Sequence, residues 1–421
     1  MRRVSIDQLR IGDRIGRDIF TNPAAPALLR AGIEVSDCFL QSLRRSGVVT
    51  VWIDDGLSQG IEPLEILTGK TRRLATVAIR DAFEDVAEAL VQRRTLTTET
   101  VQQMTDVADL MSADVRENVN SALSLNDLAS ADGYTLKHSL AVAALGLSLG
   151  LRVMRRYGWI DAQGVRRFND LDQRLSILGV GLLLHDIGKL AVGSDILHKH
   201  GPLTAEEHLA MRAHPTLGAR LLQPDSGISP LSRAVVRSHH ERWDGAGYPG
   251  RQTGAEIHQF ARIAAVVDVF DALTSDRSYL PAMPVHEGYD FVLGESGKAF
   301  DPEVVAVFRE SVAPYPPGTG VVLSDGRCGI VKEVRQGAVM RPVVRIVMDA
   351  AGVLIPAEEL DLEGAPDVSI ASTAFDPSDA RPADAPPDES CRTGDLAERP
   401  VPVAARPWAQ RLGLTDRGVR T

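Results

Sequence analysis

The densest reactive chemistry in the sequence lies at residues 239–249, which read His-His-Glu-Arg-Trp-Asp-Gly-Ala-Gly-Tyr-Pro. The two histidines follow residues 231–238, whose pattern predicts a helix. Gly245 and Gly247 allow backbone angles that a Cβ would forbid, and Pro249 restricts the exit of the turn. We therefore expect a rigid loop that holds ligand side chains at a helix end. The alternative is a surface histidine pair beside an ordinary turn.

Histidine and aspartate side chains also occur on other segments with helical patterns. The segments and their polar residues are 134–153 with His138, 174–190 with His185 and Asp186, 205–222 with His214, 231–240 with His239 and His240, and 260–273 with Asp268. Each of these five predicted helices presents polar ligands. This arrangement implies an all-helical core that is folded around one site.

The residue types in this set are those that bind divalent transition metals. Imidazole and carboxylate groups are suitable ligands for Mn, Fe, Zn and Ni. A carboxylate has two oxygen atoms, so one aspartate can bridge two ions. Two ions held about 3.5–4 Å apart can acidify a water for in-line attack on phosphorus and neutralise the developing charge. The set is therefore suited to the hydrolysis of a phosphodiester.

Each candidate ligand has a simpler interpretation when it is taken alone. His138 lies on an apolar segment, where a histidine usually serves as a core residue with one hydrogen-bond partner. His214 precedes a proline and is compatible with an ordinary helix end. Asp268 is more informative, because it lies between two valines and an unpaired buried carboxylate is costly. Only the whole set predicts a metal site.

The motifs together resemble the signature of the HD-GYP family, phosphodiesterases related to the wider HD metal-dependent phosphohydrolases. Residues 185–189, His-Asp-Ile-Gly-Lys, match the HD part, and residues 239–249 match the GYP part. Further matches, in the order of the family, are His138-Ser139, His214-Pro215 and residues 268–275. The resemblance runs from about residue 132 to about residue 308 and implies an HD-type helical bundle.

The resemblance implies two metal ions that share Asp186. The ligands implied for the first ion are His138, His185, Asp186 and Asp268. The ligands implied for the second ion are Asp186, His214, His239 and His240. Some members of the family bind a third ion through a glutamate one helical turn before the first histidine, but Tyr134 occupies that position here. Two divalent ions are therefore expected, with Fe or Mn as the metals.

Two cationic side chains are candidates for substrate binding. Lys189 follows Asp186 by three residues, so a continuous helix would place both on one face, near a phosphate or the attacking oxygen. Arg277 follows the segment of Asp268, and its guanidinium could hold a phosphate through two hydrogen bonds. The family often has a basic residue where this chain has Leu280, so one substrate contact is expected to be missing. The alternative for Lys189 is a solvated surface lysine.

Three further polar residues lie close to these motifs. Asp271 is predicted either to support a ligand or to carry a charge on the helix surface, and the sequence does not decide between these roles. Tyr248 and Glu241 are expected to shape the loop rather than to take part in catalysis.

The resemblance implies that the protein hydrolyses the bacterial second messenger cyclic di-GMP to linear pGpG, to GMP or to both. Asp186 and Lys189 are the implied catalytic residues. One alternative is an HD phosphohydrolase for another cyclic dinucleotide or nucleotide. Another is a cyclic di-GMP receptor that has lost turnover. The intact ligand set argues against the receptor, whereas Leu280 keeps it open.

The composition of the chain limits the class of protein. It has 421 residues, 44% of them hydrophobic, and a formal net charge of -10, which disfavours broad electrostatic binding to a nucleic-acid polymer. The three cysteines are far apart and predict neither a disulfide framework nor a thiolate metal site. The first residues lack a signal-peptide pattern, and the apolar run at 178–184 is too short to span a bilayer. A cytoplasmic, soluble protein without a membrane partner is expected.

The chain divides into five predicted parts. They are a small mixed α/β N-terminal accessory domain at 1–60, a helical connecting segment at 71–130, the HD-GYP domain at 131–313, a small β-rich appendage at 314–362 and a disordered, proline-rich tail at 365–421. The expected fold class is therefore mainly α. The helices of 71–130 could pack on the core or mediate a homodimer, and a regulatory protein could bind there or at the N-terminal domain.

Overall fold

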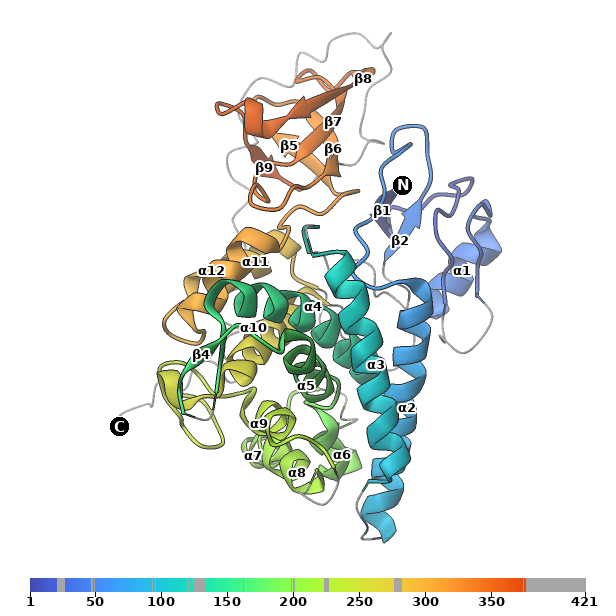
Figure 1. Ribbon diagram of the computed structural model, residues 1–421. Helices are drawn as coiled ribbons and strands as arrows, with labels where there is room; N and C mark the ends of the chain where they lie inside the picture. Colours follow the sequence, from blue (N-terminus) through green and yellow to red (C-terminus); the bar gives the residue numbers. More distant parts are fainter. Residues whose placement is uncertain are drawn as a thin grey trace, which may run out of the picture.

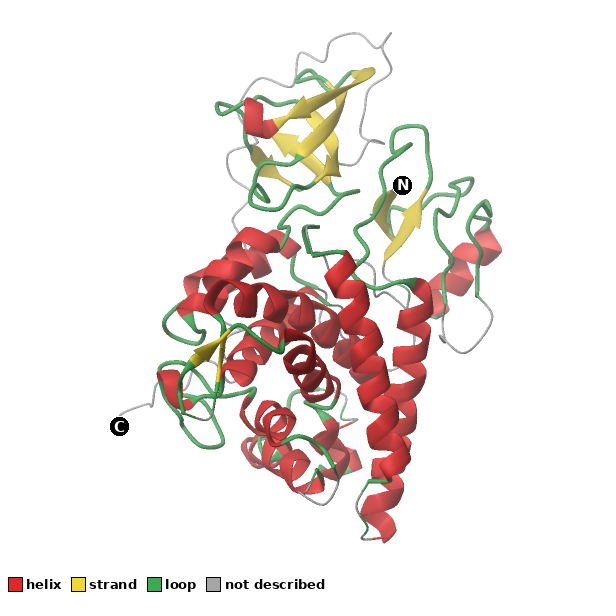
Figure 2. Ribbon diagram, in the orientation of Figure 1, coloured by secondary structure: helices red, strands yellow, loops and turns green. Residues whose placement is uncertain are grey.

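The computed structural model of this chain describes residues 1–20, 27–46, 48, 50–92, 94, 96–119, 121–123, 134–161, 163–197, 199, 201–222, 227–275, 282–373 and 375. Helices form the body of the molecule, with a small β sheet at one end and a unit built from the N-terminal residues beside that sheet (Figure 1; Figure 2). The expected fold class, mainly α with a mixed N-terminal unit and a β-rich C-terminal appendage, is confirmed.

The N-terminal unit pairs two strands that are distant in the sequence. Strand β1 (Arg2–Ser5) runs antiparallel to β2 (Thr50–Ile53). Helix α1 (Asp37–Arg45) begins after Ser36, whose hydroxyl accepts a hydrogen bond from the amide of Phe39 and so caps the helix. The unit has a hydrophobic core of its own, formed by Val4, Leu9, Ile15, Leu29, Val35, Leu40, Leu43, Val51 and Ile53.

Helices α2 (Gly69–Gln92) and α3 (Thr98–Glu117) form a pair that lies along one side of the helical body (Figure 1). Their buried side chains, among them Ile79, Val86 and Met111, belong to the same hydrophobic cluster as the helices that follow. The pair therefore packs on the core, which is one of the two arrangements that the sequence pattern leaves open.

Two apolar helices, α4 (Tyr134–Tyr157) and α5 (Leu171–Leu183), pack closely at the centre of the body. A Cβ added to Gly146 on α4 would lie 2.6 Å from a methyl carbon of Leu182 on α5, so the leucine side chain fills the space that the glycine leaves. By length and composition alone α4 could cross a membrane, but 89% of its apolar window is buried inside the fold. The apolar surface of α4 thus serves the core.

The remaining helices complete the body around this pair. They are α6 (Ser194–Leu197), α7 (Ala205–Met211), α8 (His214–Leu221), α9 (Pro230–Ser238), α10 (Gln259–Thr274), α11 (Val285–Gly294) and α12 (Pro302–Ser311), with the 3₁₀ helices η1 (Ile187–Ala191) and η3 (Gly254–Glu256) and a hairpin of β3 (Trp159–Ile160) and β4 (Arg166–Arg167). All residues of α10 except its last are buried. A helix that is buried all round lies at the centre of a large core.

Two segments that the sequence predicts as continuous helices are broken in the structure. The predicted helix at 174–190 ends at Leu183 and continues as a turn and then η1. The predicted helix at 205–222 is divided into α7 and α8 by a turn at Arg212 and Ala213. Pro215 lacks an amide donor and restricts the residue before it, which explains the second break. Each break places a candidate metal ligand at a helix end.

The C-terminal sheet has five antiparallel strands in the order β8-β7-β6-β5-β9. The strands are β5 (Gly320–Leu323), β6 (Cys328–Glu333), β7 (Val343–Met348), β8 (Leu354–Asp361) and β9 (Ile370–Ser372), and the 3₁₀ helix η4 (Leu362–Gly364) follows β8. β9 therefore lies beyond residue 362, the predicted end of the β-rich part. Residues 376–421 of the predicted tail lie outside the described residues.

The segment before α2 packs on this C-terminal sheet. The guanidinium of Arg345 on β7 donates to the carbonyl oxygen of Leu57, at 3.3 Å, and to that of Gln59. Ile61 shares a hydrophobic cluster with Ile330 on β6. Segments from the two ends of the described chain thus pack together beside the helical body (Figure 1).

Candidate metal centre

His185 and Asp186 lie in the turn between α5 and η1, against the start of α8. Gly188 permits this contact, because a Cβ at that position would collide with the carbonyl oxygen of His214. On the other side of the contact, a Cβ at Gly218 would lie 3.1 Å from the amide nitrogen of Gly188. The two glycines let the backbones of η1 and α8 meet. As a result, His214 Nε2 lies 3.3 Å from Asp186 Oδ1.

Four side chains from α4, the α5–η1 turn and α10 form a first group of candidate ligands, namely His138, His185, Asp186 and Asp268. All four are buried. His138 Nε2 lies 3.0 Å from Asp268 Oδ1 and 3.6 Å from Asp186 Oδ2. His185 Nε2 lies 3.3 Å from His138 Nε2 and 3.5 Å from the same Asp186 oxygen. The structure therefore brings together the set that the family resemblance implies for a first ion.

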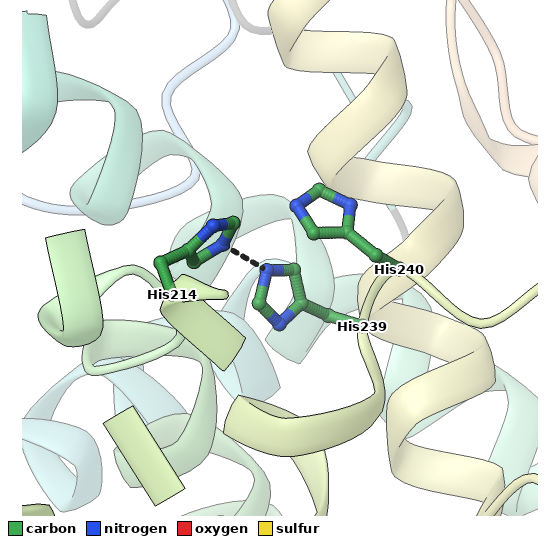
Figure 3. Close-up of side chains that lie close together, drawn as sticks. All are labelled: His214, His239 and His240. Carbon is green, nitrogen blue, oxygen red and sulfur yellow. Dashed lines mark hydrogen bonds between the residues drawn. The ribbon is translucent and has the colours of Figure 1, made fainter. Parts of the chain in front are cut away.

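His214, His239 and His240 form a second group, and Figure 3 shows their rings side by side. His214 begins α8, and the other two follow the end of α9. The ring centroids of His239 and His240 are 4.1 Å apart. Asp186 reaches this group through the contact with His214, and Asp268 Oδ2 lies 3.7 Å from His240 Nδ1. All seven candidate ligands thus form one contiguous cluster in which both carboxylates touch both groups.

Backbone carbonyl groups determine which nitrogen of three histidines faces the cluster. In each case Nδ1 lies within hydrogen-bond distance of a carbonyl oxygen earlier in the chain, the pairs being His185 with Leu182 (2.8 Å), His214 with Met211 (2.8 Å) and His239 with Val236 (2.9 Å). A carbonyl oxygen only accepts hydrogen bonds, so each Nδ1 carries the proton. Burial lowers the pKa of His185 and of His239, so each of these two rings is neutral and presents a lone pair at Nε2.

His214 Nε2 lies 3.2 Å from His239 Nε2, and the dashed line in Figure 3 marks this contact. The ring of His239 is neutral with its proton at Nδ1, so its Nε2 offers a lone pair on this side. A cation held between the two nitrogens would have both imidazoles as ligands. The residues present therefore fit a site for a divalent metal, in which imidazole nitrogens and carboxylate oxygens are the ligands.

The protonation states of the cluster agree with this arrangement. Burial lowers the pKa of His240 to about 3 and holds the pKa of His239 well below its usual value, so both rings are neutral. Burial opposes the ionisation of Asp186, but the charge of Lys189 and the neighbouring histidines hold the pKa of this carboxyl well below its usual range. His239, His240 and Asp186 thus offer neutral imidazole and anionic carboxylate, which are the forms that bind metal ions.

Asp271 has a role that the sequence leaves undecided. Its Oδ2 accepts a hydrogen bond of 2.6 Å from His138 Nδ1, and its Oδ1 accepts one of 2.9 Å from the hydroxyl of Ser275. The bond turns His138 Nε2 toward the cluster, as partners of metal-binding histidines commonly do. Although burial acts in the opposite direction, Asp268 and Asp271 raise the pKa of His138 to about 9. In the sequence, this role of Asp271 is indicated by its position three residues after Asp268, which places both side chains on the same helix face.

Lys189 extends from the cluster toward the surface. Its Nζ lies 2.5 Å from Asp186 Oδ2. Residues three apart eclipse in a 3₁₀ helix, so η1 places the two side chains on one face although the α-helix has ended. The side chain of Lys189 is 22% exposed, whereas that of Asp186 is 2% exposed. The lysine can therefore meet both the buried carboxylate and a molecule that approaches from solvent.

The loop after His240 is held by contacts that agree with the loop-shaping roles expected for Glu241 and Tyr248. The carboxylate of Glu241 accepts hydrogen bonds from the amides of Gly250, at 2.5 Å, and Gln252, at 3.1 Å. The ring of Tyr248 stacks on that of His240, with 4.9 Å between centroids and 28° between planes. The loop thus supports one face of a candidate ligand. Arg277 and Leu280 lie outside the described residues.

Comparison with known proteins agrees with this geometry. Residues 166–304 match a model of the HD domain, and residues 320–381 match a model of a KOW domain associated with the HD domain. A cyclic di-GMP phosphodiesterase of Pseudomonas aeruginosa is 32% identical over 402 residues, which cover 90% of this chain and 93% of that protein.

Two further relatives match over a shorter length. A cyclic di-GMP phosphodiesterase of Thermotoga maritima is 37% identical over 158 residues, 37% of this chain and 43% of that protein. A 3'3'-cGAMP-specific phosphodiesterase of Vibrio cholerae is 30% identical over 195 residues, 46% of this chain and 37% of that protein. Because the HD motifs lie in one buried cluster and the first relative matches over nearly its whole length, this chain belongs to the HD-GYP family of HD-domain proteins.

Proposed function

We propose that this protein is a metal-dependent phosphodiesterase that hydrolyses cyclic di-GMP to linear pGpG, to GMP or to both. The observation that carries the proposal is the pair of adjacent histidine and aspartate groups that could each hold a metal ion, joined by Asp186 and bordered by Lys189. The relative that matches along nearly the whole chain is a cyclic di-GMP phosphodiesterase, which supports the choice of substrate.

We propose two divalent ions, Fe or Mn, divided between the two groups of ligands. The two oxygens of Asp186 support this division, since Oδ2 faces His138 and His185 of the first group and Oδ1 faces His214 of the second. Such ions would acidify a water and neutralise the charge that develops on the phosphodiester. Asp268 would complete the first site and, through its second oxygen, also lies near His240.

The chain itself would orient the reacting groups. Asp186 holds the ammonium of Lys189 in place, and the partial exposure of Lys189 allows this charge to reach a non-bridging oxygen of the phosphodiester. Asp271 keeps the imidazole of His138 in one orientation. The burial of the other ligands excludes bulk water, which strengthens each of these interactions. On the sequence resemblance we also assign Arg277 to substrate binding.

A related substrate is the second candidate, because one relative acts specifically on 3'3'-cGAMP. The two cyclic dinucleotides share the phosphodiester ring and differ in one base. Purified protein should be analysed for metal content under anaerobic and aerobic conditions and assayed in parallel with both nucleotides. The proposal requires faster turnover of cyclic di-GMP by metal-loaded protein. Tight binding of cyclic di-GMP without turnover would instead identify a receptor.

Three broader proposals follow from the same assignment. We propose that the protein acts in the bacterial cytoplasm, where this messenger is expected, and that a homodimer or a regulatory protein uses the N-terminal unit or the pair α2–α3. Light scattering of the purified chain tests the homodimer. We also propose that the chain divides into parts at 1–60, 71–130, 131–313, 314–362 and 365–421. Limited proteolysis tests this division, because protected fragments should end near these boundaries.

A further inference from the structure

The metal cluster is most accessible on the side of His240. The side chain of His240 is 25% exposed, whereas those of the other six candidate ligands are between 0% and 9% exposed. Lys189, the next most exposed side chain at the cluster, is 22% exposed. A substrate therefore has to approach past His240 and Lys189.

A guanidinium group lies one aromatic ring away from His240, the most exposed of the candidate ligands. The ring of Tyr248 stacks on His240, and the guanidinium carbon of Arg212 lies 4.4 Å from the centroid of the same Tyr248 ring. Burial and then the charge of Asp268 raise the pKa of Tyr248, while Arg212 acts in the opposite direction. Arg212 and the carboxylate of Asp268 thus both lie within electrostatic reach of one phenol, which stays neutral.

The backbone of Arg212 belongs to the turn that also sets a metal ligand. Its amide donates to the carbonyl oxygen of His208, at 2.9 Å, and ends α7. His214 follows two residues later and bonds through Nδ1 to the carbonyl of Met211, at 2.8 Å. The break between α7 and α8 therefore fixes the position of Arg212 relative to the cluster.

Arg212 is suited to bind a phosphodiester that is not the one being cleaved. Lys189 bonds directly to Asp186, so it would contact the phosphodiester that reacts there. The guanidinium of Arg212 instead contacts the Tyr248 ring, which also stacks on His240. Stacking uses the face of a guanidinium, and its five N–H donors lie in the plane, where they match two oxygens of one phosphate.

We propose that Arg212 binds the second phosphodiester of a cyclic dinucleotide while Lys189 contacts the phosphodiester that is cleaved. This inference rests on the proposed function. It makes Arg212 a specificity-determining residue, because a substrate with a single phosphodiester has no group for it to hold.

The test compares cyclic di-GMP with bis(p-nitrophenyl) phosphate, which has one phosphodiester, using metal-loaded full-length protein. Arg212→Ala should lower kcat/KM for cyclic di-GMP by about 10- to 100-fold, mainly through KM, as expected for the loss of charge-assisted hydrogen bonds. The loss for bis(p-nitrophenyl) phosphate should be at least about tenfold smaller. Arg212→Lys keeps the charge but not the fork of donors and should fall between wild type and Arg212→Ala.

Metal analysis and a control variant show whether the loss is specific to substrate binding by Arg212. Metal content should match that of wild type in both variants, and the exposed Arg220 on α8 provides the control, since Arg220→Ala should behave as wild type toward both substrates. Equal losses on the two substrates would overturn the inference, because Arg212 would then act on the metal ligands through Tyr248. Unchanged kinetics would overturn it as well. If wild type cleaves bis(p-nitrophenyl) phosphate but no cyclic dinucleotide, the proposed function fails and this inference falls with it.

Discussion

His138 and Asp271 are 133 positions apart in the chain, yet His138 Nδ1 and Asp271 Oδ2 share a buried hydrogen bond of 2.6 Å. The bond leaves Nε2 of His138 facing Asp186 and Asp268. The carboxylate of Asp271 is in turn held by the hydroxyl of Ser275. This contact joins α4 to α10 at the metal cluster, and it determines how well His138 can serve as a ligand.

We expect Asp271→Ala to weaken metal binding at the first group by about 10- to 100-fold, the usual effect of losing a carboxylate behind a metal-binding histidine. The ring of His138 would lose the partner that fixes its orientation. Calorimetric titration of metal-free protein with Mn²⁺ measures the effect. Asp290→Ala, which changes an exposed carboxylate on α11, is the matched control. Equal affinities for both variants would mean that Asp271 does not position the ligand.

Metal binding should release a proton from His138. The pKa of about 9 means that this ring carries two protons near pH 7.5 in metal-free protein, whereas burial keeps His239 and His240 neutral. Loss of the Nε2 proton frees the ligand atom, so affinity should rise with pH up to about 9. Calorimetry near pH 7.5 in buffers of different ionisation enthalpy should show release of about one proton. Release of none would contradict this assignment.

The raised pKa of His138 should also make the stability of metal-free protein depend on pH. The folded pKa of His138 lies above the ordinary value of 6.5, so its contribution to the free energy of unfolding is complete below pH 6.5 and is lost as the pH rises through about 9. Urea denaturation of metal-free protein between these pH values tests this. The slope should disappear in His138→Gln, which cannot bind the second proton.

Asp186→Ala and Lys189→Ala should separate metal binding from catalysis. Asp186 touches both groups of ligands, so its removal should abolish turnover and release at least one ion. Lys189 is not a ligand, and its removal should leave the metal content unchanged while the rate falls. Elemental analysis gives the metal content of both variants, and a turnover assay gives their rates. A full complement of metal in Asp186→Ala would show that the two groups do not share this carboxylate.

Gly188→Ala should destabilise the fold and reduce metal content together. The added methyl group would collide with the carbonyl of His214 and push η1 away from α8. A cost of about 1–3 kcal/mol in the free energy of unfolding is typical of such overpacking. Gly193→Ala is the control, since no atom lies within 4 Å of a Cβ there. If chemical denaturation gives equal stabilities for both variants, then the close approach of Gly188 and Gly218 is not needed.

The sequence by itself was enough to predict which side chains carry the chemistry. His185-Asp186 and His239-His240 occur within local motifs, and helical periodicity placed His138 and Asp268 on apolar helices. Such patterns depend on residues a few positions apart, so they can be read without the fold. The same patterns predicted the helical body and the β-rich part after it, and these agree with the structure.

Tertiary structure decided the features that depend on contacts between distant segments. The helix at His185 ends early because Gly188 has to meet the backbone of α8, and this contact is invisible to periodicity. Likewise, Asp271 could not be distinguished from a surface charge until α4 brought His138 to it. Arg212 had no motif at all, and the break between α7 and α8 together with the contact to the Tyr248 ring places it near the cluster. Local sequence identifies the candidate ligands, whereas long-range packing determines their orientation and the access to them.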